Sequence, residues 1–516
     1  MPSSQRQEVF NVLLAQLLQE RGAVVAPESI MYTGAQKARQ MPDVIVNFQG
    51  LRTAIEGEVD AANAKDKAVA SAMHRVETGV AHIGVGVVYP ASLRAVEFSQ
   101  LKSELAHAKL EIAVVTETGS SGFVSGDVDH LERTLRSTFE QLIKEDIVAE
   151  AVALIDAAVD RFAIPALDYR GIWGRIIDSL GGPTDEKVQE KLTALERGAF
   201  VRVGGLIVLN AMIFHDVLAT NHKKLTRLVD ITPKMSLLLF PEQWEYILDN
   251  INYYSIFHLA RRIFNDFGTS AWGTQEALRF MVKTALKISE QRAALRHDLM
   301  GRVYHRLLAD AKYLGTYYTS IPAATLLLKL ALRPSVWEIE WNDLDALRHF
   351  RVADLACGTG TLLMAAADVI SDNYISAAAE RGEKIRLEEF HNLLVENIIH
   401  GYDVLTSALH LTASTLASRT PHISFHGMNL TTMPLGGKDS KLGSIEFLQG
   451  GEVKAELNLF ANPAPEQVTG EGMAILPSAS LPSLDLCVMN PPFTRSVGGN
   501  LLFGSLPGNA QNCRNA

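Results

Sequence analysis

The chain has 516 residues, more than one ordinary hydrophobic core accommodates, which predicts two or three domains. Its composition is that of a globular protein, and its net charge of −10 excludes an overall basic field that would attract nucleic acid. Three widely spaced cysteines form neither a disulfide framework nor a metal knuckle. The polar N-terminus lacks a signal peptide, and the apolar stretch 203–214 is too short to span a bilayer, so we expect a cytoplasmic protein without membrane contact.

Residues 1–127 predict a compact α/β domain. Apolar residues recur at helical spacing over residues 5–20, and a strand pair follows around the turn Gln49-Gly50. The remaining elements are expected to be a helix at about 64–81, a strand at 82–90, a helix at about 92–108 and a strand at 110–117.

Residues 128–297 predict a helical bundle or connector, and strands alternate with helices again in residues 298–516. Four strands are expected in this last domain, within residues 350–354, 397–404, 422–429 and 484–490. The stretch 433–482, rich in Gly, Pro and Ser, is expected to be an insertion or a long loop before the fourth strand.

A glycine turn follows the first of these strands, in the sequence "VADLACGTGTLL". The strand ends at Asp354, and Gly358 and Gly360 let the backbone approach a ligand closely at the carboxyl end of the strand. Neither a nucleotide fingerprint nor a Walker lysine is present, and a lone glycine turn is common in α/β proteins. Asp403 ends the second strand, where an acid typically binds ribose hydroxyls.

The fourth strand runs into Asn490, two prolines and Phe493. Prolines end the strand pairing and stiffen the loop. The Asn490 amide oxygen and the Pro491 carbonyl offer two acceptors for one amino group, and the Phe493 ring offers a flat face for a base. The sequence therefore predicts a site for a planar substrate that carries an amino group.

The glycine turn followed by "NPPF" resembles the N6-adenine DNA methyltransferases that use S-adenosylmethionine. The upstream "GTYYTSIPAA" resembles the motif that precedes the glycine turn in that family, and the order of motifs is most similar to type I methylation subunits and single-chain restriction-modification enzymes. The resemblance covers about residues 298–496 and implies an S-adenosylmethionine-dependent methyltransferase domain with a Rossmann-like fold. It places Tyr318 and Thr319 at the methionine end of the cofactor, Asp354, Ala356, Gly358 and Gly360 in the cofactor loop, Asp403 at the ribose, and Asn490, Pro491, Pro492 and Phe493 at a flipped adenine.

Two positions depart from that family's pattern. Ser320 stands where proline is usual. Asn429 stands where many members place an acid facing the cofactor's adenine, and its amide can also form a hydrogen bond there. We therefore expect Asn429 to be part of the cofactor site.

Three acids of the first domain form a second candidate site. Glu56 and Glu58 are two residues apart on one strand and point the same way, and Asp43 begins the neighbouring strand. Three carboxylates on one face repel one another unless they bind a divalent ion. The αβββαβ-like order with Pro-Asp and Glu-x-Glu resembles the PD-(D/E)xK nucleases, which implies a Mg²⁺ site at Asp43, Glu56 and Glu58.

This second site departs from the nuclease pattern at Glu58, which replaces the usual lysine. Lys65 or Lys67 on the following helix would have to substitute. The alternative interpretation is a degenerate fold that does not cleave DNA, or plain surface acids.

The sequence predicts a site-specific DNA adenine-N6 methyltransferase of a restriction-modification or phage-defence system, with a restriction-endonuclease-like first domain. Its expected partners are double-stranded DNA and a specificity or complementary methyltransferase subunit. Only 23 residues follow Phe493, fewer than the family's remaining strands need, so we expect a fragment, a frame-shifted product or half of a split enzyme. The alternatives are a non-catalytic DNA-binding or assembly subunit, and a methyltransferase that acts on a protein glutamine.

Overall fold

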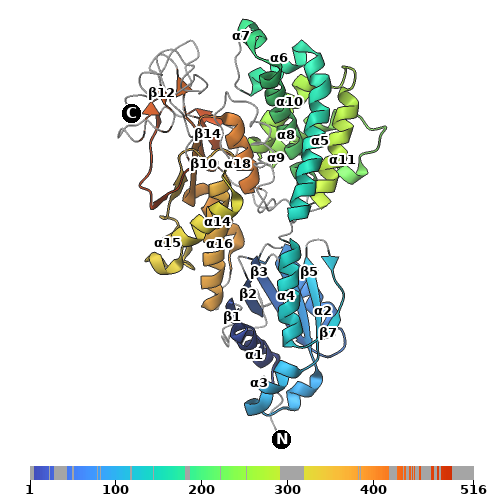
Figure 1. Cartoon of the computed structure of the whole chain (residues 1–516), viewed down its shortest axis with the longest axis vertical. Helices are drawn as coiled ribbons and strands as arrows, with labels where there is room; N and C mark the ends of the chain where they lie inside the picture. The colour runs from blue at the N-terminus through green and yellow to red at the C-terminus, as the bar shows by residue number, and fades with distance from the viewer. Residues whose placement is uncertain are drawn as a thin grey trace. The chain divides into compact units, whose positions relative to one another are not determined.

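The protein has a mixed α/β structure, shown in Figure 1 as a computed structural model. It describes residues 5–21, 24–27, 43–48, 51–77, 80–81, 83–116, 119–142, 145–180, 186–220, 222–251, 253–290, 319–381, 383, 385–417, 427–433, 435–436, 441–442, 444, 447, 453–454, 466–469, 473–475 and 478–490. The contacts divide the chain into two compact units. The N-terminal unit comprises residues 1–147, 337–346 and 370–390, and the C-terminal unit comprises the rest.

The N-terminal unit is built on a sheet of seven strands among the described residues. Its main elements are α1 (Gln7–Glu20), β1 (Val24–Pro27), β2 (Val44–Phe48), β3 (Leu51–Val59), α2 (Ala64–Glu77), β4 (Ile83–Tyr89), η1 (Ala91–Ala95), α3 (Phe98–His107), β5 (Leu110–Thr116), β6 (Gly119–Ser120), β7 (Val124–Gly126) and α4 (Val128–Leu142). The strands β1, β2 and β3 pair antiparallel, β3 and β4 pair parallel, and β5 is antiparallel to β4. The predicted helices and strands of this region are thus confirmed, whereas β1, β6 and β7 were not predicted.

Helices cover both faces of this sheet. The apolar stripe of α1, including Phe10, Leu14 and Leu18, is buried in one core with side chains of β2 to β5. On α2 the contact surface is made of small residues, and a Cβ added at Gly84 of β4 would lie 2.6 Å from the carbonyl oxygen of Ala72. Glycine at this position therefore lets α2 lie directly against the strand.

The helix α4 belongs to this unit and extends it past the predicted boundary at residue 127. Val128, Leu131 and Leu135 of α4 are buried in the same core as α1. The predicted boundary at residue 297 lies outside the described residues, and the division between helical connector and methyltransferase-like domain stays a prediction.

The first half of the C-terminal unit is helical, as predicted. Its elements are α5 (Glu145–Asp168), α6 (Arg170–Ser179), α7 (Glu186–Lys191), α8 (Ala194–Ala219), η2 (Leu228–Asp230), α9 (Leu239–Asn250), α10 (Tyr254–Phe267) and α11 (Thr274–Glu290). Thr193 and Glu196 form a capping box at the start of α8. This helix is longer than the stretch 203–214 and is apolar enough to cross a membrane by length and composition, but 89% of its apolar window is buried inside the structure. It is therefore the central core helix of the bundle.

The second half of the unit carries the sheet that positions the candidate site. Its elements are α14 (Ile321–Ala331), η3 (Pro334–Val336), α15 (Leu344–Leu347), β8 (Val352–Asp354), α16 (Thr361–Glu380), α17 (Leu387–Leu393), η4 (Leu394–Ile398), β9 (Ile399–Asp403), α18 (Thr406–Ala417), β10 (Gly427–Thr432), β11 (Leu435–Gly436), β12 (Lys441–Leu442), β13 (Val453–Lys454), β14 (Glu466–Thr469), β15 (Met473–Ile475), β16 (Ser478–Ala479) and β17 (Leu486–Cys487). Some of these, including α15 and the second half of α16, are assigned to the N-terminal unit.

The strand order of this sheet is β15-β14-β10-β9-β8-β17. The four predicted strands β8, β9, β10 and β17 are parallel, which confirms that part of the prediction. The expectation of a long loop over residues 433–482 is wrong in part, because β14 and β15 extend the sheet in antiparallel pairing beyond β10. Short strands of three or four residues have too little periodicity to be recognised in a sequence rich in Gly and Pro.

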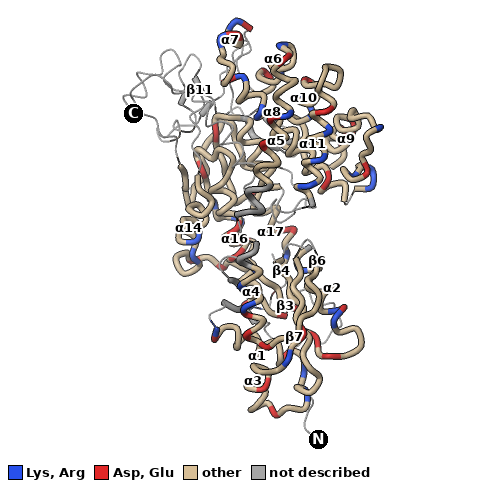
Figure 2. Tube along the Cα trace, turned by 45° about the vertical axis from the view of Figure 1, so that its right-hand side comes forward, with Lys and Arg blue, Asp and Glu red and all other residues tan. Residues whose placement is uncertain are grey.

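Charged residues of both signs are interspersed along the described parts of both units, as the colours along the chain trace in Figure 2 show. This distribution agrees with the expectation that the protein has no overall basic field.

Candidate active site at the carboxyl edge of the C-terminal sheet

The candidate site lies at a switch point in the order of the parallel strands. The chain proceeds from β8 to β9 and β10 on one side, and β17 then joins β8 on the other side. In open α/β sheets, ligands bind outside the carboxyl ends of the strands at such a point. Asp354 ends β8, Asp403 ends β9 and Asn490 follows β17, so three predicted site residues come to this edge.

The glycine turn after β8 has the backbone conformation that its glycines allow. Gly358 and Gly360 have φ angles of +53° and +85°, in the region that disfavours residues with a side chain. The Ala356 amide donates to Asp354 Oδ1 at 3.0 Å, and the Gly360 amide donates to the Cys357 carbonyl at 2.8 Å. The turn then leads directly into α16, which begins at Thr361.

Asp403 connects the end of β9 to this turn. Its Oδ2 accepts a hydrogen bond from the Gly358 amide at 2.8 Å, and its Oδ1 accepts one from the Leu405 amide at 2.9 Å. Burial raises the pKa of Asp403, although these backbone N–H groups act in the opposite direction. The carboxylate therefore holds the loop between β8 and α16 to the neighbouring strand.

Asp354 is almost completely buried below the turn. Its burial, with a further contribution from the nearby Asp403 charge, raises the pKa of Asp354 to about 7. Acids with raised pKa values at the ends of neighbouring strands are a common property of functional sites. They also make this edge a favourable place for a positive charge.

Asn490 is oriented by a residue from another part of the chain. Its Nδ2 donates a hydrogen bond to Thr319 Oγ1 at 3.1 Å, just before α14. This bond uses the amino group of the amide and leaves Oδ1 as the acceptor that the sequence predicted for a substrate amine. The Val488 amide, directly after β17, donates to the Ala353 carbonyl at 2.9 Å, which places the end of β17 beside β8.

Asn429 does not lie at the edge where the other site residues meet. In the pairing of β10 with β9 it is opposite His400, whereas Thr432 is opposite Asp403. Three residues along a strand correspond to about 10 Å. The Asn429 amide donates from Nδ2 to the Glu396 carbonyl at 2.8 Å, and its expected contact with the cofactor stays a prediction.

Tyr318, Pro491, Pro492 and Phe493 lie outside the described residues. Their roles at the cofactor and the substrate stay predictions.

The turn fits a ligand such as S-adenosylmethionine in one specific respect. A Cβ added at Gly358 would meet no atom within 4 Å, so there is open space beside this glycine. The carboxylates of Asp354 and Asp403 adjoin that turn, and the cofactor carries hydroxyls and a positive sulfonium. The residues present therefore suit the group that the sequence predicted.

The acids of the N-terminal unit do not gather as a metal site. Among the described residues, no group of three His, Cys, Asp or Glu side chains is placed to hold a metal ion. Asp43 accepts a hydrogen bond from the Gly57 amide at 2.8 Å, and the Glu56 carboxylate forms a buried ion pair with Arg75 Nε of α2 at 2.6 Å. Glu58 lies on the same strand as Glu56 and is half-buried.

The lysines that were expected to replace the nuclease lysine lie at the start of α2. Lys65 Nζ pairs with Glu111 of β5 at 2.8 Å and lies over the Phe123 ring. Lys67 is exposed. Arg75, which the sequence analysis did not consider, is the basic residue paired with Glu56.

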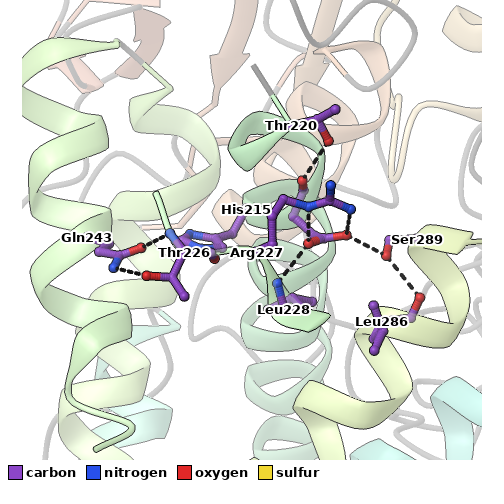
Figure 3. A network of polar contacts seen from close by, with 9 residues as sticks. His215, Thr220, Thr226, Arg227, Leu228, Gln243, Leu286 and Ser289 are labelled. Atoms are coloured by element: carbon purple, nitrogen blue, oxygen red, sulfur yellow. Dashed lines mark hydrogen bonds and ion pairs between the residues drawn. The ribbon is translucent and has the colours of Figure 1, made fainter. Parts of the chain in front are cut away.

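A buried polar network holds the connection between α8 and α9 in the bundle (Figure 3). Asp216 pairs with Arg227 at 3.0 Å and accepts a hydrogen bond from Ser289 at 2.8 Å. His215 is fully buried, with Nε2 2.9 Å from the Thr226 carbonyl, and burial lowers the pKa of its imidazole. His215 is therefore a packed core residue.

No protein-family model and no curated protein matches the sequence. Among solved structures, a chain of a cryo-EM structure of a DrdV–DNA complex is similar with a TM-score of 0.34 and 13% sequence identity. The match covers 82% of this chain and 37% of that chain, so this chain spans well under half of the length of that protein. A likeness of this degree establishes neither a shared fold nor a shared activity.

Proposed function

We propose that the chain carries the catalytic part of an S-adenosylmethionine-dependent DNA adenine-N6 methyltransferase of the restriction-modification or phage-defence type. The observation that carries the proposal is the orientation of Asn490 by Thr319 at the same sheet edge as the glycine turn and its two acids. One part of this edge suits the cofactor, and the other suits an amino group.

The cofactor half rests on Asp403 and the turn at Gly358. The carboxylate oxygens of Asp403 each have more than one lone pair, so they can accept from ribose hydroxyls while holding the Gly358 and Leu405 amides. The open side of Gly358 gives a ligand access to the backbone. The cofactor would supply an activated methyl group, which leaves alignment as the main task of the protein.

The substrate half rests on Asn490. Because Thr319 holds its Nδ2, the Oδ1 is directed to accept a hydrogen bond from the amino group of the substrate. Such an acceptor stabilises the positive charge that develops on the nitrogen as it attacks the methyl carbon. A DNA base has to leave the duplex to reach this position, and Phe493 is the expected stacking partner.

The experiment compares wild type with Asn490→Ala for two activities: transfer of labelled methyl groups to DNA and binding of S-adenosylmethionine. We expect the substitution to abolish N6-methyladenine formation and to leave cofactor affinity within about twofold, because the amide acts on the amino group of the substrate. The matched control is Asn250→Ala, which changes an exposed asparagine of α9. Methylation near the wild-type rate in Asn490→Ala would refute the proposed role.

The same assay separates DNA from the other amine-bearing substrate class. Asn-Pro-Pro-aromatic motifs also suit the amide of a protein glutamine, so label in protein and not in DNA would move the assignment to that class. Partners would be double-stranded DNA and a specificity or complementary methyltransferase subunit.

For the N-terminal unit, one observation argues against a cleaving nuclease site. Arg75 neutralises Glu56, one of the three acids that a nuclease site would need. The test is a cleavage assay with Mg²⁺ or Mn²⁺ that compares wild type with Asp43→Ala and Glu56→Ala. Cleavage by wild type that both substitutions abolish would instead establish the nuclease site.

A further inference from the structure

Thr412 of α18 (Thr406–Ala417) is a second side chain that contacts the glycine turn. This residue is fully buried, and its Oγ1 donates to the Gly358 carbonyl at 2.9 Å while lying 3.1 Å from the Ala408 carbonyl of its own helix. The Gly358 amide donates to Asp403, so both backbone polar groups of Gly358 are held. The sequence gives no direct signal for this contact, since the two residues are 54 positions apart.

The same side chain also fixes the position of the second glycine. A Cβ added at Gly360 would lie 2.6 Å from Thr412 Cγ2 and 3.0 Å from its Oγ1, so the turn is packed directly against Thr412. A methyl group holds Gly360 from one side while the hydroxyl holds the Gly358 carbonyl. Two contacts from one residue define the part of the turn that has positive φ angles.

The helix that carries Thr412 is itself fixed in the C-terminal unit. The helix begins three residues after Asp403, and it also carries Ser414, whose hydroxyl accepts a hydrogen bond from Asn210 of α8. The helix also packs against α10 and β10. Thr412 therefore projects from a scaffold that both the bundle and the sheet hold in place.

We infer that Thr412 is a positioning residue for the cofactor loop: with Asp403 it clamps Gly358 in the conformation that presents the loop to the ligand. This inference rests on the proposed function, because S-adenosylmethionine is the ligand that the proposed function assigns to this loop. Thr412 itself does not touch the ligand and acts through the Gly358 carbonyl. A buried carbonyl that loses its donor favours another backbone conformation or a water partner.

The test has a readout that does not depend on the cofactor: amide hydrogen exchange in residues 355–361 of the full chain. Thr412→Val keeps the shape of the side chain and removes the donor, so we expect the amides of this segment to exchange roughly fivefold to tenfold faster. Thr412→Ser retains the hydroxyl and should restore slow exchange. The control is Thr415→Val, on the same helix, where Oγ1 donates at 2.8 Å to the Leu411 carbonyl.

Faster exchange in Thr412→Val than in Thr415→Val supports the inference, and equal exchange in the two variants overturns it. If Thr412→Val does not fold, as judged by circular dichroism, Thr412→Ala takes its place, because it removes the donor without adding volume. Faster amide exchange in Thr412→Ala than in Thr415→Val then supports the inference, and equal exchange overturns it.

Calorimetric titration with S-adenosylmethionine adds the functional consequence. We expect Thr412→Val to bind about tenfold more weakly and Thr412→Ser and Thr415→Val to bind like wild type. If wild type binds S-adenosylmethionine and Thr412→Val binds it with the same affinity, the positioning role of Thr412 is overturned. Absence of binding by wild type refutes the proposed function instead, and the exchange comparison then still decides whether Thr412 fixes the turn.

Discussion

Asp354 is the residue in which the chemistry of the site has the clearest consequence for stability. Its pKa of about 7 in the folded protein is well above the value of an aspartate in an unfolded chain. The folded state therefore binds a proton more strongly than the unfolded state, and the stability from this group is fully present below about pH 4 and is lost as the pH rises through 7. A shift of about three pKa units corresponds to about 4 kcal/mol.

We predict that Asp354→Asn removes the loss of stability that occurs in wild type as the pH rises through 7. The Asn side chain keeps an oxygen for the Ala356 amide and carries no charge. Chemical denaturation should give similar free energies of unfolding for variant and wild type at pH 4.5, and a higher value for the variant at pH 8, by up to about 4 kcal/mol. A constant difference between the two proteins across this range would show that Asp354 is ionised throughout.

At the scale of the element, the two glycines with positive φ angles in the turn after β8 can be compared by the free energy of unfolding that each loses when it is replaced by alanine. Gly358→Ala introduces a side chain into open space and should cost about 1 kcal/mol of backbone strain. Gly360→Ala adds an overlap with Thr412 to the same strain and should cost about 3 kcal/mol or more. Equal losses of unfolding free energy in the two variants would contradict the packing of Thr412 against Gly360.

The helix α2 gives a second prediction, because it carries one buried and one exposed ion pair. Arg75→Met leaves the buried Glu56 carboxylate without this cation and should lower the free energy of unfolding by about 3 kcal/mol. Lys65→Met removes a pair in which the lysine side chain is 52% exposed and should cost less than about 1 kcal/mol. Similar losses in the two variants would show that Glu56 is not stabilised mainly by Arg75.

Elements with strong local patterns were the predictable part of this fold. The stripe of α1, the hairpin β2–β3 and the glycine turn after β8 each depend on neighbouring residues, and all three are confirmed. The strands β1, β14 and β15 have three or four residues and acquire their structure from partners along the sheet edge, which a local pattern does not contain. The contact of Thr412 with Gly358 was unpredictable for the same reason.

At the scale of the C-terminal unit, a buried hydrogen bond joins the bundle to the helix α18, which packs against the sheet. Asn210 of the core helix α8 donates to Ser414 of α18, and both side chains are buried. We predict that Asn210→Ala lowers the free energy of unfolding of this unit by about 1–2 kcal/mol. The control Asn250→Ala, at an exposed position, should cost less than about 0.5 kcal/mol. Equal effects would mean that the bundle and the sheet are held together by other contacts.

The central claim is that the turn after β8 and the acid at the end of β9 form an S-adenosylmethionine site. The most direct measurement is calorimetric titration of the full chain with S-adenosylmethionine, for wild type and Asp403→Ala. We predict saturable binding by wild type and a loss of at least tenfold in affinity in the variant, because Asp403 holds the Gly358 amide of the turn. Equal affinity in the two proteins, or no binding by folded wild type, would contradict the account.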